Sequence, residues 1–166
     1  MRSGASGFTL IEVMLVVALV AVLAATLLIR NPVESLRLRG AATKVRADIG
    51  YARKLAVTTQ QRAGVEFHPA GYSVYRDVAS AALANAPGRG CSSDAAGRFV
   101  VDFTAPRCAE LRGVTLAYSA ATVAFDPLGS PVDEDGDPLA SQTVTVSAPG
   151  GARTLTIEAQ TGRVSE

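Results

Sequence analysis

Residues 8–29 read FTLIEVMLVVALVAVLAATLLI, an almost uninterrupted apolar run. As an α-helix this run would be about 33 Å long, which matches the roughly 30 Å hydrocarbon core of a bilayer. A secretory signal peptide has a shorter apolar core that ends in a small-residue cleavage site. Val22-Leu23-Ala24 imitates such a site, but the apolar run continues beyond it. The run therefore predicts one transmembrane helix over 8–29.

Glu12 is the one charged residue within this run. A carboxylate in the hydrocarbon region is costly unless a partner neutralises it, so acids in such segments mark functional sites. A plain membrane anchor has no use for one. Glu12 is therefore a candidate functional residue.

The composition excludes several classes of function. The 166 residues include one histidine, two cysteines and no tryptophan, and the net charge is +1. Dense zinc sites and histidine-based catalytic triads need more histidine and cysteine than this, and a strongly basic nucleic-acid binder would carry more positive charge. The numbers favour a membrane-anchored, non-enzymatic protein with one domain and a short appendage.

The charge is divided along the chain. Residues 30–62 carry eight bases against two acids, a net charge of +6, whereas residues 63–166 carry seven arginines against twelve acids, a net charge of −5. One interpretation is that the basic residues 30–62 form the solvent-exposed face of a helix. The other is complementary packing between neighbouring subunits, or contact with anionic lipid headgroups.

The apolar run is followed by the pattern of an amphipathic helix. Pro32 can begin a new helix segment or kink a continuous one. Apolar residues then recur every three or four positions, which predicts an amphipathic helix half over 30–62 that packs on a sheet. The members of this stripe are Leu38, Ala42, Val45, Ile49, Ala52 and Ala56.

Residues 63–166 carry the shorter period and the turn signals of β-structure. The runs 64–67 and 72–75 around His68-Pro69-Ala70-Gly71 predict a hairpin, and Pro149-Gly150-Gly151 predicts a second one. The Ala-, Gly- and Ser-rich residues 78–97 are expected to form a long loop. Further strands are expected at 98–103, 113–118, 122–125, 142–147 and 153–158. The pattern predicts an α+β protein whose helix lies against an antiparallel sheet.

The residues around Glu12 resemble a known signal. Gly7-Phe8-Thr9-Leu10-Ile11-Glu12-Val13 is similar to the class III signal of type IV pilins and type II secretion pseudopilins. The resemblance implies a pilin-like fold, a leader at 1–7 that prepilin peptidase removes by cutting between Gly7 and Phe8, and N-methylation of Phe8. It also implies that Glu12 guides assembly with other pilins or pseudopilins. The new ammonium of Phe8 would lie about one helical turn from Glu12, so pairing the two removes the cost of a lone charge in lipid.

The same resemblance implies a single-pass protein of the bacterial inner membrane, with a cytoplasmic leader and a periplasmic head at 63–166. The positive-inside tendency would instead keep the basic residues 30–62 in the cytoplasm, but long domains translocate largely regardless of charge. In the oxidising periplasm, Cys91 and Cys108 are expected to form a disulfide that ties down the loop. Metal binding by two cysteines alone is not expected.

Three further segments resemble the GspH/FimT group of minor pseudopilins and minor pilins. They are Ala52-Arg53-Lys54-Leu55-Ala56, the turn Phe125-Asp126-Pro127-Leu128-Gly129-Ser130-Pro131, and the closing hairpin over 152–158 with Thr161-Gly162-Arg163-Val164. The resemblance implies a minor subunit in the tip or priming complex of a type IV pilus or of a type II secretion pseudopilus. The sequence does not distinguish these two machines.

The group also supplies an alternative function, because some FimT-like members bind DNA through a C-terminal Gly-Arg-x-Arg. Here the sequence is Gly162-Arg163-Val164-Ser165, so Arg163 is a weak candidate and the second arginine is missing. The acidic head would also repel phosphate groups. DNA binding is therefore disfavoured.

The remaining candidates indicate structure rather than chemistry. The acidic residues 133–137 could offer oxygen ligands to calcium, but the EF-hand pattern fails and a solvated turn is the better interpretation. His68 has no second histidine with which to share a metal. We find no nucleophile with a base, phosphate loop or dinucleotide fingerprint, so no catalytic residue, metal or cofactor is predicted. A membrane-anchored periplasmic enzyme is the least favoured alternative.

Overall fold

The computed structural model describes residues 9–29 and 32–166. The predicted leader 1–7 and Phe8 lie outside these residues. The chain divides into two units, Met1–Pro32 and Val33–Glu166.

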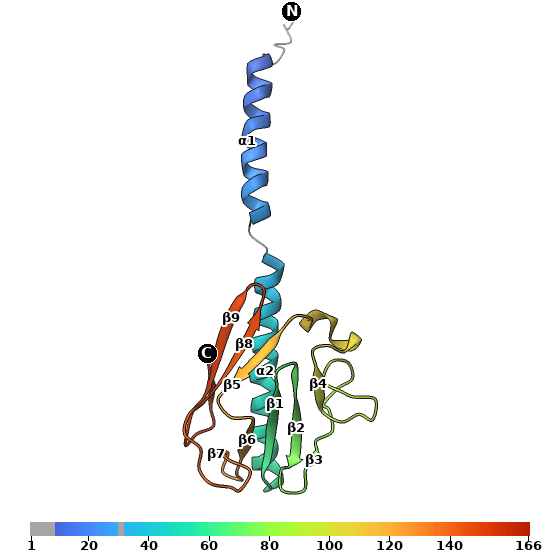
Figure 1. The fold of residues 1–166 in the computed structure, drawn as a ribbon, viewed down its shortest axis with the longest axis vertical. Coiled ribbons are helices and arrows are strands. Elements are labelled where there is room, and N and C mark those ends of the chain that lie inside the picture. The colour runs from blue at the N-terminus through green and yellow to red at the C-terminus, as the bar shows by residue number, and fades with distance from the viewer. Residues whose placement is uncertain (1–8, 30–31) are drawn as a thin grey trace, which may run out of the picture. The chain divides into compact units, whose positions relative to one another are not determined.

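The first unit contains helix α1 (Leu10–Ile29) (Figure 1). Its sequence has no glycine or proline, the two residues that most disfavour a helix interior. Thr9 closes its N-terminal end, because the backbone N–H of Glu12 donates to the Thr9 carbonyl at 3.0 Å and approaches the Thr9 hydroxyl at 3.3 Å. This satisfies one of the donors that the start of a helix leaves unpaired.

The second unit is built around helix α2 (Pro32–Thr59), which lies alongside the strands in Figure 1. Proline is well suited to the first turn of a helix because the N–H that it lacks would have no partner there. Every member of the predicted apolar stripe is buried, and Ala41 is buried with them. These side chains form one hydrophobic core with the inner faces of the strands, so the predicted packing of the helix on a sheet is confirmed.

Within the described residues the strands form two antiparallel sheets. The order of the first sheet is β3-β2-β1-β6-β7, with β4 also paired to β2, and the order of the second is β10-β9-β8-β5. The strands are β1 (Ala63–His68), β2 (Gly71–Asp77), β3 (Ala82–Leu83), β4 (Val100–Asp102), β5 (Thr115–Tyr118), β6 (Thr122–Phe125), β7 (Pro131–Val132), β8 (Gln142–Ala148), β9 (Gly151–Ile157) and β10 (Val164–Ser165). The predicted α+β fold is thus present, with its strands divided between two sheets.

Both predicted hairpins are confirmed. His68 pairs with Gly71 across the β1–β2 turn, and Ala148 pairs with Gly151 across the β8–β9 turn. The sheets are linked by stacked rings, because Phe67 of β1 and Tyr118 of β5 have centroids 6.0 Å apart.

The expected loop 78–97 is wrong in part. Its residues include β3, and Asn85 forms a bridge with Arg98. The structure also adds a 3-10 helix, η1 (Pro106–Leu111), and the two-residue strands β7 and β10. A strand of two residues is too short to show a period, and these pairings depend on neighbouring strands rather than on local sequence.

Candidate assembly site

Glu12 lies in the first turn of α1, held by the Thr9 cap, and its side chain is exposed. It is surrounded along the helix by apolar side chains. The large apolar residues of α1 from Leu10 to Leu23 are 52–78% exposed. They occupy nearly every position, so they cover all faces of the helix rather than one stripe. Apolar surface on every side of a helix is typical of burial in lipid or among other helices.

No helix within the described residues meets the length and apolarity of a membrane span. The transmembrane segment over 8–29 stays a prediction. The cleavage site is also untested, because Gly7 and Phe8 lie outside the described residues.

The three segments that resemble the GspH/FimT group meet at one junction in the second unit. The Nε–H of Arg53, on α2, donates to the carbonyl of Gly129 at 3.0 Å. Gly162 packs on the same turn, since a Cβ there would lie 2.3 Å from the Gly129 carbonyl oxygen and 2.9 Å from the Phe125 ring. The shared motifs therefore hold α2, the turn after β6 and the C-terminal turn together.

A polar network that the sequence analysis missed ties α2 to β2. Asp48 accepts hydrogen bonds from the Tyr72 hydroxyl at 2.5 Å and from Lys44 at 2.9 Å, and Lys44 also donates to Ser92 at 2.6 Å. Burial, with the nearby charge and hydrogen bond of Asp48, raises the pKa of Tyr72 well above its ordinary value. The four-residue spacing of Lys44 and Asp48 on a helix was the available signal, but nothing in the sequence identified Tyr72 as their partner.

Cys91 and Cys108 are joined by a disulfide, with Cα atoms 4.7 Å apart. Both cysteines are buried. The bond fastens the segment that precedes β4 to η1, and Ser92 connects it to the α2 network. The disulfide-linked segments are thereby connected to α2.

Arg163 is exposed in the C-terminal turn. Its carbonyl accepts the backbone N–H of Glu158 at 2.9 Å, so an acid shares the same turn.

The acidic loop 133–137 uses its first carboxylate internally. One oxygen of Asp133 accepts the backbone N–H groups of Asp135, Gly136 and Asp137 at 2.8–3.0 Å, and these bonds, that from Asp137 foremost, lower the pKa of Asp133. Across the described residues, no three His, Cys, Asp or Glu side chains are grouped so as to hold a metal ion. His68 is exposed beside its hairpin turn.

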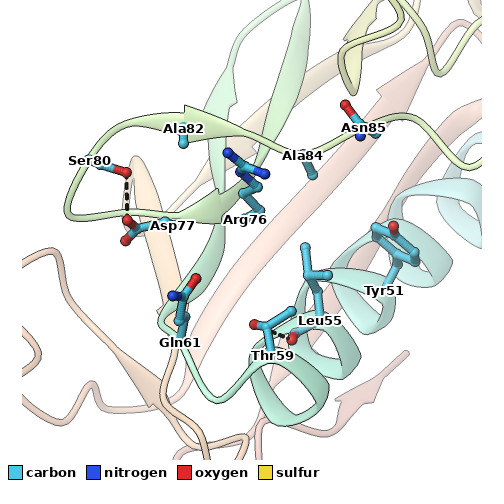
Figure 2. Close-up of a pocket in the computed structure, with 10 residues that line it drawn as sticks. All are labelled: Tyr51, Leu55, Thr59, Gln61, Arg76, Asp77, Ser80, Ala82, Ala84 and Asn85. Atoms are coloured by element: carbon cyan, nitrogen blue, oxygen red, sulfur yellow. Dashed lines mark hydrogen bonds between the residues drawn. The ribbon is translucent and has the colours of Figure 1, made fainter.

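A hollow of about 550 Å³ lies between the C-terminal half of α2 and the β2–β3 hairpin. Figure 2 shows the residues that line it. Some of its polar side chains bond to near neighbours in the chain. The Thr59 hydroxyl donates to the Leu55 carbonyl at 2.8 Å, and Asp77 accepts from the Ser80 hydroxyl at 2.5 Å.

Known proteins share this sequence pattern and this fold. Residues 2–28 match the model of the prokaryotic N-terminal methylation motif, and residues 41–161 match the model of type II transport protein GspH. Two crystal forms of the type IV minor pilin FimU of Pseudomonas aeruginosa strain PAO1 are similar in structure. One has 21% identity and a TM-score of 0.51 over 80% of this chain and 89% of that chain; the other has 23% identity and a TM-score of 0.50 over 77% and 90%. No curated protein is significantly similar to the chain.

A methylation motif on an apolar helix, followed by a helix packed on antiparallel sheets, defines a type IV pilin-like subunit. More specifically, the chain belongs to the GspH family, whose model matches more than half of its length. Members of this family are structural proteins rather than enzymes, as the sequence analysis expected.

Proposed function

We propose that the chain is a minor subunit in the tip or priming complex of a type IV pilus or a type II secretion pseudopilus. The observation that carries this proposal is the surface of α1, which is apolar on all sides and bears one carboxylate, Glu12, in its first turn. The membership of the chain in the GspH family supports it.

In this scheme residues 8–29 insert into the inner membrane, with the leader 1–7 in the cytoplasm and the head in the periplasm. Prepilin peptidase cuts between Gly7 and Phe8, and Phe8 is N-methylated. The new ammonium and Glu12 then neutralise each other, within one chain or between neighbours, because an unpaired charge in an apolar surrounding is unfavourable. Pairing between neighbours would also fix the register in which their helices pack.

Glu12→Ala tests the role of the carboxylate. We expect the variant to be missing from purified filaments while its head stays folded and its disulfide formed. Met14→Ala is the matched control, because it also shortens an exposed side chain of α1 but removes no charge. Recovery of Glu12→Ala in filaments at the normal level would show that Glu12 does not guide assembly.

Gly7→Val tests the cleavage site. The leader should remain attached, and intact-mass measurement should find the full chain instead of one that begins at methylated Phe8. Gly4→Val, a second glycine replacement in the leader, should be processed normally. A mature Phe8 terminus in Gly7→Val would refute the proposed site.

A clean deletion in the native host identifies the machine. Loss of protein secretion with normal motility would indicate a pseudopilin, and loss of surface pili with normal secretion would indicate a minor pilin. Loss of DNA uptake alone would favour the DNA-binding alternative, in which case Arg163→Ala should reproduce it.

A further inference from the structure

A groove of about 630 Å³ lies on the part of the head that the disulfide fastens. It is lined by Arg89, Gly90, residues 93–97 and Arg107, and is called the arginine groove below. Arg89 is two residues before Cys91, and Arg107 directly precedes Cys108. The disulfide therefore brings two exposed arginines from separate segments to one concave surface.

Asp94 is the acidic residue that lines this groove, and its charge is already matched. Its carboxylate accepts the Nε–H of Arg98 at 2.7 Å and the backbone N–H groups of Ala96 and Arg98 at 2.9 and 2.8 Å. Asp102 lies near enough to Arg107 to interact with its charge, but it is bonded to the backbone and hydroxyl of Thr104. The groove is thus locally positive in a head whose net charge is −5.

The opposite edge of the same sheet carries the opposite charge. The strand order ends at β7, and the acidic loop 133–137 follows β7 directly. At the other edge β3 and β4 pair with β2, and the segment between them contains Arg89. Figure 1 shows β7 and β4 on opposite sides of the head. Glu134, Asp135 and Asp137 are exposed, while the Asp133 carboxylate accepts backbone N–H groups of its own turn. Arg62 donates to the Glu134 carbonyl at 2.9 Å and offsets part of this charge, but the four acids outnumber it.

We propose that the arginine groove of one head binds the acidic loop 133–137 of a second copy of this chain. Because the two patches differ and lie at opposite edges, the contact between two copies is head-to-tail rather than that of a symmetric dimer. The inference rests on the proposed function, because subunits anchored side by side have a high effective concentration. Exposed ion pairs that are weak singly would then hold neighbouring heads in one orientation.

The test uses the full chain in detergent micelles, with self-association followed by sedimentation at 50 mM salt. Arg89→Glu/Arg107→Glu gives each copy two acidic edges, and Glu134→Arg/Asp135→Arg gives each copy two basic edges. Each variant alone should associate at least about tenfold more weakly than the native chain, since like charges face each other. Mixing the two variants should restore association, because every contact then joins opposite charges. Native association should weaken at 500 mM salt, where screening is strong.

Arg112→Glu is the matched control, because it reverses an exposed arginine near the disulfide outside the groove and should associate normally. Thiol labelling checks that each variant keeps its disulfide. If the groove variant does not fold, the loop variant still provides the test, because it lies away from the disulfide.

Unchanged association in the loop variant, or no recovery in the mixture, would overturn the proposal. Loss of binding to a fluorescent DNA duplex in the groove variant, with self-association intact, would instead make the groove a nucleic-acid site. The Glu12→Ala filament test is independent of these outcomes, so failure of this inference is distinguishable from failure of the proposed function.

Discussion

The guanidinium Nε of Arg53 lies 3.0 Å from the carbonyl oxygen of Gly129, although the two residues are 76 positions apart in the chain. Gly129 has a φ of +86°, in the left-handed region that favours glycine. In that conformation the Gly129 carbonyl accepts the bond from Arg53 of α2. A Cβ on Gly129 would lie 3.0 Å from the Arg53 Nε, so the absence of a side chain leaves room for the arginine. The C-terminal turn completes the junction through Gly162, whose Cα lies too close to Gly129 and Phe125 to carry a side chain.

Gly162→Ala should therefore destabilise the head. The new methyl would lie 2.3 Å from the backbone oxygen of Gly129, and the residue would also keep a φ of +60°. Overpacking and left-handed strain together cost about 2–4 kcal/mol. Chemical denaturation of the full chain would measure this loss.

Gly113→Ala separates the two contributions. Gly113 has a φ of +82° but open space around its Cα, so alanine there should cost only the conformational strain of about 1–2 kcal/mol. Equal losses at the two positions would contradict the packing argument.

The sequence predicted features that depend on local pattern. The stripe from Leu38 to Ala56 was identified correctly because a period of three to four residues reports directly which side of a helix is buried. The β1–β2 and β8–β9 hairpins were identified because their turn residues lie between two adjacent runs.

Features that depend on distant residues were not predictable in this way. Arg53, Gly129 and Gly162 belong to three motifs that the sequence displays separately, and only the path of the chain brings them together. Likewise Tyr72 appears as an ordinary strand residue until α2 places Asp48 against its hydroxyl. Within the candidate site, Glu12 could be identified from the sequence alone, because a carboxylate in an apolar helix is unusual in itself.

Tyr72 should make the stability of the head dependent on alkaline pH. Its pKa is raised in the folded state by burial and by Asp48. Its contribution is therefore complete below the unfolded pKa of about 10 and is lost as the pH rises above that value. Tyr72→Phe should lower stability at pH 8 by about 1–3 kcal/mol, through the lost hydrogen bond to a charged group. It should also flatten the decline above pH 10 when unfolding is measured with urea.

Tyr75→Phe is the control for this prediction. Burial and the hydrogen bond to Glu66 raise the pKa of Tyr75 to about 12, but its side chain is less buried than that of Tyr72. Its removal should change the alkaline slope less. An identical slope in the native chain and in Tyr72→Phe would contradict the assignment.

The disulfide should contribute measurably to stability. Cys91 and Cys108 are 17 positions apart, and cross-linking a loop of this size stabilises by about 3 kcal/mol in the chain-entropy model. Cys91→Ala/Cys108→Ala should lower the Tm, and a reductant should lower the Tm of the native chain to a similar extent. The reductant should leave the Tm of the double variant unchanged. A further decrease in that Tm would mean that the reductant acts on something other than the disulfide.

Packing of α2 on the strands should provide much of the stability of the head. Ile49 is fully buried on α2, whereas Leu36 on the same helix is 64% exposed. Ile49→Ala leaves a cavity between the helix and the sheets and should cost about 2–5 kcal/mol. Leu36→Ala removes a similar number of methyl and methylene groups from an exposed position and should change stability by no more than about 0.5 kcal/mol. Equal losses in denaturation would mean that the exposed face of α2 is as important for folding as its buried stripe, which the burial pattern contradicts.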